Sequence, residues 1–102
     1  MLSEIHVGDV GTIFRVTIKD GDSVVDVSNV DSKTIYLQKP DGSNLTKAAS
    51  YYTNGTDGII QYVSQTGDLD QAGTWQIQAK IDFRTDVFNT NIEKFKVLRN
   101  LI

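Results

Sequence analysis

The sequence predicts an all-β fold, an antiparallel sandwich of about seven to nine strands. Apolar and polar residues alternate along several segments, which is the period of a half-buried strand. Gly, Pro, Asp and Asn separate these segments at short intervals, and the 3.6-residue period of a long helix is not found. The chain has 102 residues, of which 39% are hydrophobic. This is the size of one domain, so we expect a single domain over residues 1–102.

The clearest predicted strand runs from Thr74 to Phe83, where Trp75 begins a series of apolar residues at every second position. Such alternation places one face on the core and the other in water. Three further strands follow the same rule: Ile13–Lys19 with Phe14, Val16 and Ile18 inward, Thr34–Lys39 with Ile35 and Leu37 inward, and Glu93–Val97 with Phe95 and Val97 inward. Weaker candidates are Glu4–Val7, Val24–Val27, Leu45–Thr53, Ile59–Val63 and Val87–Ile92.

Turn residues connect these strands. Asp20-Gly21-Asp22 can close a tight hairpin. In Lys39-Pro40-Asp41-Gly42, the proline ring fixes φ and the glycine lies where the chain reverses. Asn54-Gly55-Thr56-Asp57-Gly58 predicts another loop. We expect one short helical turn at Asp68–Ala72, ended by Gly73.

The segment Leu69–Ile77 is the most informative. A leucine precedes a tight corner, Gly73 lies two positions before Trp75, and Ile77 lies two positions after it. This arrangement is similar to the corner before strand F of immunoglobulin-like domains, with Trp75 as the centre of the core. The chain has no cysteine, so the similarity is to the wider class of immunoglobulin-like sandwiches and not to antibody domains.

Five motifs follow one another along the chain. They are Val7-Gly8-Asp9-Val10-Gly11-Thr12-Ile13-Phe14, Asp20-Gly21 before Val25-Asp26-Val27-Ser28, Lys39-Pro40-Asp41-Gly42, Asp57-Gly58-Ile59-Ile60-Gln61-Tyr62 and Ala72-Gly73-Thr74-Trp75. In this order they resemble the N-terminal domain of the baseplate upper protein family of tailed phages, and also small free-standing immunoglobulin-like virion proteins. Proteins of that family continue into long C-terminal regions that carry receptor-binding proteins, whereas this sequence stops at Ile102.

The resemblance implies a non-enzymatic structural protein of a tailed bacteriophage virion, acting in tail, baseplate or fibre attachment. Its partners would be other phage structural proteins and copies of itself in a symmetric assembly. The protein would be located in the virion, assembled in the host cytoplasm. A capsid decoration (cement) protein is the alternative within the same class, since such a protein would clamp capsomers with the same small sandwich.

Composition argues against several other classes. Ten basic and 13 acidic side chains give a net charge of −3, and no basic cluster could neutralise a row of phosphates, so we expect no nucleic-acid partner. No apolar run approaches the roughly 20 residues of a membrane helix, so we expect no membrane partner. The first residues show neither a basic leader nor an apolar core of a signal peptide. With no Cys and one His, thiol chemistry and Cys/His zinc sites are excluded.

The remaining candidate chemistry has simpler explanations. His6 has no Gly-x-Ser-x-Gly motif to accompany it, and the pairs Asp20/Asp22 and Asp68/Asp70 are typical of turns and not of a calcium loop. Gly8-Asp9-Val10-Gly11 lacks the Lys-Ser/Thr ending of a phosphate-binding loop. We therefore expect no catalytic residue, no metal site and no cofactor, and predict that the protein is not an enzyme.

Two groups of residues are candidates for an interface: the adjacent Tyr51 and Tyr52, and the aliphatic Leu98, Leu101 and Ile102 in a tail over residues 98–102. Tyrosine is enriched at protein interfaces, and large aliphatic side chains are costly to leave in water. Tyr51 and Tyr52 could alternatively stack on a sugar ring. A carbohydrate-binding module is therefore the alternative from a different class.

Overall fold

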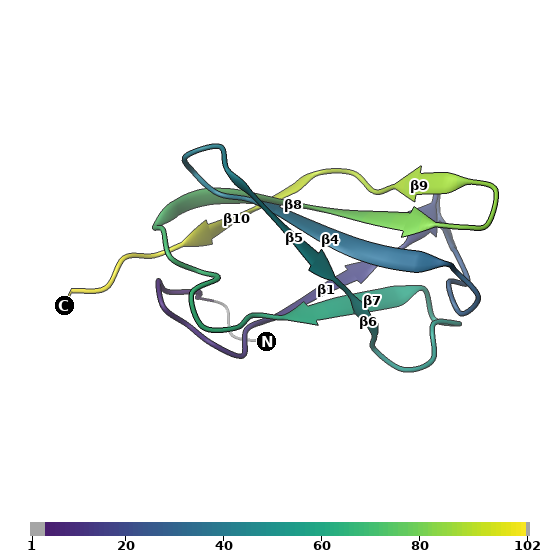
Figure 1. Cartoon of the computed structure of the whole chain (residues 1–102), viewed down its shortest axis with the longest axis horizontal. Helices are drawn as coiled ribbons and strands as arrows, with labels where there is room; N and C mark the ends of the chain where they lie inside the picture. The colour runs from purple at the N-terminus through teal and green to yellow at the C-terminus, as the bar shows by residue number, and fades with distance from the viewer. Residues whose placement is uncertain (1–3, 102) are drawn as a thin grey trace.

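The computed structural model describes residues 4–101, and these form two antiparallel sheets packed face to face (Figure 1). One sheet has the order β1-β7-β6 and contains β1 (Ile13–Thr17), β7 (Ile59–Val63) and β6 (Ser50–Tyr51). The other has the order β10-β8-β4-β5 and contains β10 (Glu93–Val97), β8 (Gly73–Asp82), β4 (Ser32–Gln38) and β5 (Asn44–Ala48), with β9 (Val87–Asn89) also paired to β8. A small hairpin joins β2 (Lys19–Asp20) to β3 (Ser23–Val24).

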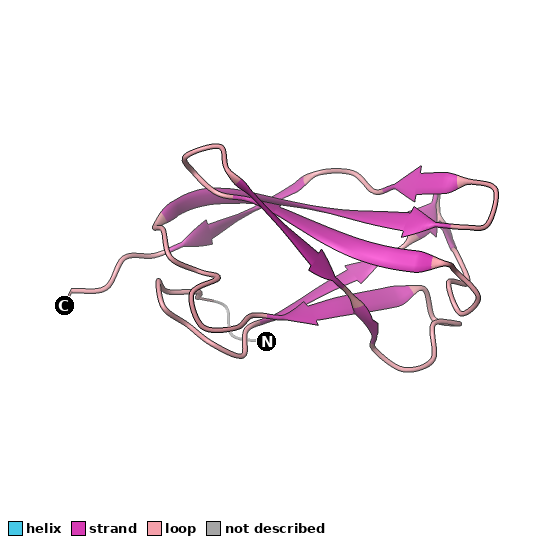
Figure 2. Cartoon of the chain, in the orientation of Figure 1, coloured by secondary structure: helices cyan, strands magenta, loops and turns pink. Residues whose placement is uncertain are grey.

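The predicted fold class is confirmed: the described residues form strands and loops only (Figure 2). The helical turn expected at Asp68–Ala72 was wrong. The chain makes one hydrogen-bonded turn, in which the Asp68 N–H donates to the Gln65 carbonyl (3.0 Å), and then continues through a bend at Leu69 and an irregular segment to β8. Leu69 explains the difference, because its side chain is buried in the core while its carbonyl accepts a hydrogen bond from Gly8 N–H (2.7 Å). Both contacts draw the segment away from a helical path.

The core lies between the two sheets and follows the alternation read from the sequence. Trp75 is completely buried on β8, and its indole ring contacts Phe95 of β10 with centroids 5.9 Å apart. Phe95 in turn lies 5.1 Å from Phe14 of β1, so aromatic rings connect the two sheets. Most positions predicted to face inward are buried, including Ile18, Ile35, Leu37, Ala79, Ile81 and Val97. Val16, Ile77 and Phe95 face the core but are only half-buried.

Two weaker strand predictions were only partly right. Leu45–Thr53 is not one strand, because β5 pairs with β4 in the five-stranded sheet whereas β6 pairs with β7 in the other. The chain changes sheets at Ala49, whose N–H donates to the Lys33 carbonyl (3.0 Å). Glu4–Val7 contributes only a single parallel bridge, His6 with Leu98.

Glycines at positive φ form the predicted turns. Gly21, with a φ of 63°, begins the two-residue loop of the β2–β3 hairpin, where Asp20 pairs with Ser23. Gly42, with a φ of 91°, ends the turn between β4 and β5 and donates its N–H to the Lys39 carbonyl (2.9 Å).

Candidate functional site

Tyr51, the first of the two predicted interface tyrosines, packs against the core. Its half-buried ring packs against the core residues, and its hydroxyl donates to the Val27 carbonyl (2.7 Å). The Lys33 ammonium lies 4.2 Å from the ring centroid. Tyr51 therefore attaches β6 to the loop before β4, and little of its ring is left for a partner.

Tyr52 is the more accessible of the pair, with 46% of its surface exposed. The Arg15 guanidinium of β1 lies over one face of its ring, with Cζ 4.1 Å from the centroid. Arg15 is itself held by a hydrogen bond from Nε to Gln61 Oε1 (3.2 Å). One face of Tyr52 is thus already covered, which leaves the other face and the ring edge for any contact.

The predicted interface tail begins at the end of β10 and is anchored at its first residue. Leu98 N–H donates to the Ile5 carbonyl (2.7 Å) and Val7 N–H donates to the Leu98 carbonyl (2.9 Å), while Asn100 Nδ2 donates to the Val7 carbonyl (2.8 Å). Leu98 is 37% exposed and Leu101 is 100% exposed. Ile102 lies outside the described residues. The tail leaves the sandwich at one end, away from β6, so the structure does not bring the two groups of candidates together (Figure 1).

A buried polar cluster surrounds Asp68. Its carboxylate accepts hydrogen bonds from the Tyr62 hydroxyl and from Gln65 N–H (2.8 Å), and it forms an ion pair with Lys47 (3.2 Å). Burial by itself would raise the pKa of Asp68, but these hydrogen bonds and the Lys47 charge outweigh it and hold the pKa below its ordinary value. Burial, together with the bond to Asp68, raises the pKa of Tyr62 to about 12. The polar groups of the cluster bond to one another, and Asp68 is buried. The cluster therefore stabilises the fold and is not a binding site.

The other predicted turn carboxylates also act within the fold. Asp70 pairs with Lys39 (2.9 Å), and Asp41 accepts a hydrogen bond from the Gln71 amide (2.8 Å), so the β4–β5 turn is tied to the segment before β8. The hydroxyl and N–H of Ser43 and the Gln71 amide lower the pKa of Asp41 to about 2. Within residues 4–101, no three His, Cys, Asp or Glu side chains gather as they would around a metal ion.

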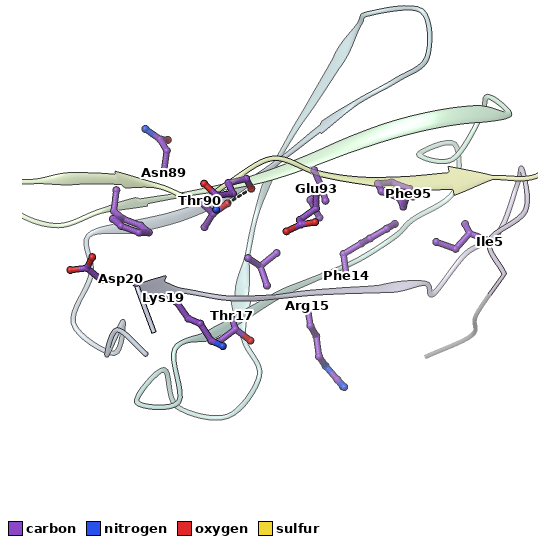
Figure 3. A pocket seen from close by; sticks show the side chains of 15 residues that line it. Ile5, Phe14, Arg15, Thr17, Lys19, Asp20, Asn89, Thr90, Glu93 and Phe95 are labelled. Atoms are coloured by element: carbon purple, nitrogen blue, oxygen red, sulfur yellow. Dashed lines mark hydrogen bonds between the residues drawn. The ribbon is translucent and has the colours of Figure 1, made fainter. Parts of the chain in front are cut away.

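A groove of about 720 Å³ opens between β1 and the strands β9 and β10 (Figure 3). These strands are on neighbouring edges of the two sheets, where β1 ends one sheet and β10 ends the other. The apolar side chains along the groove are Ile5, Phe14, Val16, Ile77, Phe88 and Phe95. Sequence reasoning missed the groove, because alternation predicts which side chains face inward but not whether two sheet edges close over them.

A second, smaller hollow of about 280 Å³ lies on the outer face of the five-stranded sheet. Tyr36 and three glutamines line it, and the Gln76 amide donates to Gln38 Oε1 (3.1 Å). The amides therefore partly satisfy one another.

No family model matches the sequence, and no curated protein is significantly similar to it. In the part of the chain that the structure describes, no helix is long and apolar enough to cross a membrane. The geometry thus offers two surface features for function: the exposed aliphatic tail and the groove beside β1.

Proposed function

We propose that the protein is a non-enzymatic structural component of a tailed bacteriophage virion, acting in tail, baseplate or fibre attachment. The observation that carries this proposal is the aliphatic tail, which leaves one end of the sandwich and exposes Leu101 completely. Covering a side chain of this kind contributes about 1.5–3 kcal/mol. The order of turn and strand motifs from Val7 to Trp75, which resembles the baseplate upper protein family, supports the same function.

The anchoring of the tail suits an attachment role. The two backbone hydrogen bonds between Leu98 and the segment Ile5–Val7 fix the point at which the tail leaves the sandwich. A partner therefore meets a tail whose origin and direction are already set, which lowers the entropy lost on association. The partners are other virion proteins and further copies of this chain.

The experiment is to locate the protein in virus particles. An antibody against the purified protein is used for immunogold electron microscopy of particles from the culture that produces it, and the same purified particles are analysed by mass spectrometry. The expected result is label on the tail or baseplate, with the protein present at a fixed ratio to the tail proteins. Label on the capsid would show that the protein is a capsid decoration protein and has no role in attachment. Particles free of the protein would overturn the proposal.

A further inference from the structure

The outer edge of β1 is an unpaired strand edge. β1 is the last strand of its sheet, and hydrogen bonds from Ser64 N–H to the Thr12 carbonyl (2.8 Å) and from Ile18 N–H to the Gly58 carbonyl (2.7 Å) flank its ladder with β7. Because hydrogen-bonded pairs alternate in an antiparallel ladder, Ile13, Arg15 and Thr17 direct their N–H and C=O groups away from β7. Among residues 4–101 no other segment bonds to these groups.

The groove lies directly beside this edge. Phe14 of β1 lies on one side, and Phe95 of the other sheet lies on the opposite side (Figure 3). Val16 of β1 and Phe88 of β9 also line the groove. Val16, Phe88 and Phe95 are only half-buried, so apolar surface remains for a further side chain to cover. An extended segment added to β1 would bond to the free backbone groups and place every second side chain in the groove.

Four ionisable residues line the groove: Arg15, Lys19, Asp20 and Glu93. Lys19 and Asp20 lie at one end and Arg15 extends away from the other sheet, so Glu93 is the charged group beside Phe95 (Figure 3). Glu93 lies on the same face of β10 as Phe95, because residues two apart on a strand point the same way, and Figure 3 shows its side chain extending toward β1. Within the described chain Glu93 forms no ion pair. A segment that fits the groove should therefore carry a cation and an apolar residue on one face.

The tail of this chain has that pattern. Arg99 and Leu101 are two residues apart, so they share one face of an extended segment, and both are exposed. We propose that the tail from Arg99 onward of one copy adds as an edge strand to β1 of a second copy, with Arg99 paired to Glu93 and Leu101 in the apolar groove. Arginine is well suited to this position because its guanidinium can bind a carboxylate through two parallel hydrogen bonds.

The donor and the acceptor must be different copies. Leu98 is held against Ile5 and Val7, and Glu93 lies five residues back along extended chain, a distance of about 17 Å. The tail runs onward from Leu98, so its own Arg99 cannot return to Glu93. Pairing of two β1 edges with each other is disfavoured, because it would bring the positively charged Arg15 and Lys19 side chains of both copies close together.

Tail and groove are different surfaces of one molecule, so the contact is head-to-tail. Such a contact generates a ring when the rotation closes, or a filament when it does not. The inference deepens the proposed function by naming a second copy as the partner, and it rests on that function for its biological setting.

The test is self-association of the purified full-length protein, measured by sedimentation velocity over a range of concentrations. The parent should associate, and Glu93→Arg and Arg99→Glu should each weaken association by at least about tenfold, the loss that corresponds to 1.4 kcal/mol. Each single variant has like charges in its groove and on its tail. Mixing the two variants places opposite charges at every contact between unlike copies, so the mixture should associate more strongly than either variant alone.

Two controls complete the experiment. Lys94→Glu changes a charge on the opposite face of β10 and should leave association unchanged, while Leu101→Asp should abolish it. Thermal unfolding of every variant verifies that each one folds. A parent that stays monomeric at all concentrations, or variants that fail to associate when mixed, would overturn the inference. Particle labelling is independent of this measurement. A protein that is monomeric in solution but present in virions would therefore support the proposed function and overturn only the head-to-tail contact.

Discussion

Asp68 is charged in a nearly buried position because three donors surround it. Its pKa is lowered in the folded protein, so the stability that it contributes is present above the unfolded value of 3.8 and is lost as the pH falls through the folded pKa. The stability that Tyr62 contributes depends on pH in the opposite direction, because its pKa is raised from 10.0 to about 12. Its contribution is complete below pH 10 and is lost between pH 10 and about 12.

Replacing the carboxylate tests the cluster. Asp68→Asn leaves Lys47 without its partner and should lower the free energy of unfolding at pH 7 by about 1–3 kcal/mol. The difference from the parent should shrink below pH 3.8, where the parent loses the same charge. Urea unfolding between pH 2.5 and pH 8 measures this, with Asp22→Asn in the exposed β2–β3 loop as the control. Two curves that stay parallel down to pH 2.5 would show that the charge contributes nothing.

Gly55 and Gly42 have nearly the same backbone conformation, with φ values of 90° and 91°. Alanine is strained at both positions, but only at Gly55 would its Cβ meet backbone, with Ser28 Cα at 2.8 Å and Ser28 N at 2.9 Å. Gly42→Ala should cost about 1–2 kcal/mol, the penalty of left-handed backbone alone. Gly55→Ala should cost clearly more in urea unfolding. Equal losses would mean that the loop moves away from Ser28 without penalty.

Single residues were the hardest level to predict from the sequence. Asp68 was predicted to be a turn residue, and in the structure its carboxylate accepts the Gln65 N–H at the turn. Its contacts with Tyr62 and Lys47 come from a strand six residues before it and from a different sheet. No local pattern marks those contacts, so the sequence did not predict that this turn carboxylate is buried.

At the level of elements, alternation was reliable where a strand keeps one face on the core. β8 shows this best, because it lies between β4 and β10 and buries Trp75, Ala79 and Ile81 on one face. Alternation was less reliable for Leu45–Thr53, since the chain leaves one sheet for the other at Ala49 while its residue pattern continues. It also could not reveal the groove, which depends on the separation of the β1 and β10 edges.

Trp75 is the residue on which β8 depends most. Trp75→Ala removes the ring packed on Phe95 and the hydrogen bond from Nε1 to the Gln71 carbonyl (3.0 Å). It should lower the free energy of unfolding by about 3–5 kcal/mol. Val87→Ala on β9, where the side chain is 58% exposed, is the control and should change stability by less than about 0.5 kcal/mol. Similar unfolding midpoints in urea for the two variants would contradict a core centred on Trp75.

At the scale of the whole molecule, deleting residues 99–102 separates folding from assembly. The purified protein loses the exposed Asn100 hydrogen bond to Val7, worth about 0.5–1 kcal/mol, so its melting temperature should fall by no more than about 8 °C. The same deletion should remove the protein from virions, as quantified by mass spectrometry of purified particles. Normal incorporation would assign attachment to another surface.

A deletion that starts one residue earlier has a different expected result. Leu98 carries both backbone hydrogen bonds to the Ile5–Val7 segment, so its removal frees that segment as well as the tail. The melting temperature should then fall further than it does for the deletion of residues 99–102. This makes Leu98 part of the folded unit and Leu101 part of its exposed surface.

The parallel bridge between His6 and Leu98 has a mechanical consequence. The N-terminal segment enters the bridge at Ile5 and the tail leaves it beyond Leu98, so a pull on the two ends of the chain slides the strands past each other in shear. The two hydrogen bonds, 2.7 Å and 2.9 Å, are then loaded together instead of opening one after the other. In single-molecule pulling from both ends, the parent should therefore yield at a higher force than a chain without residues 98–102. The bridge would thus raise the force at which the sandwich unfolds when its two ends are pulled apart.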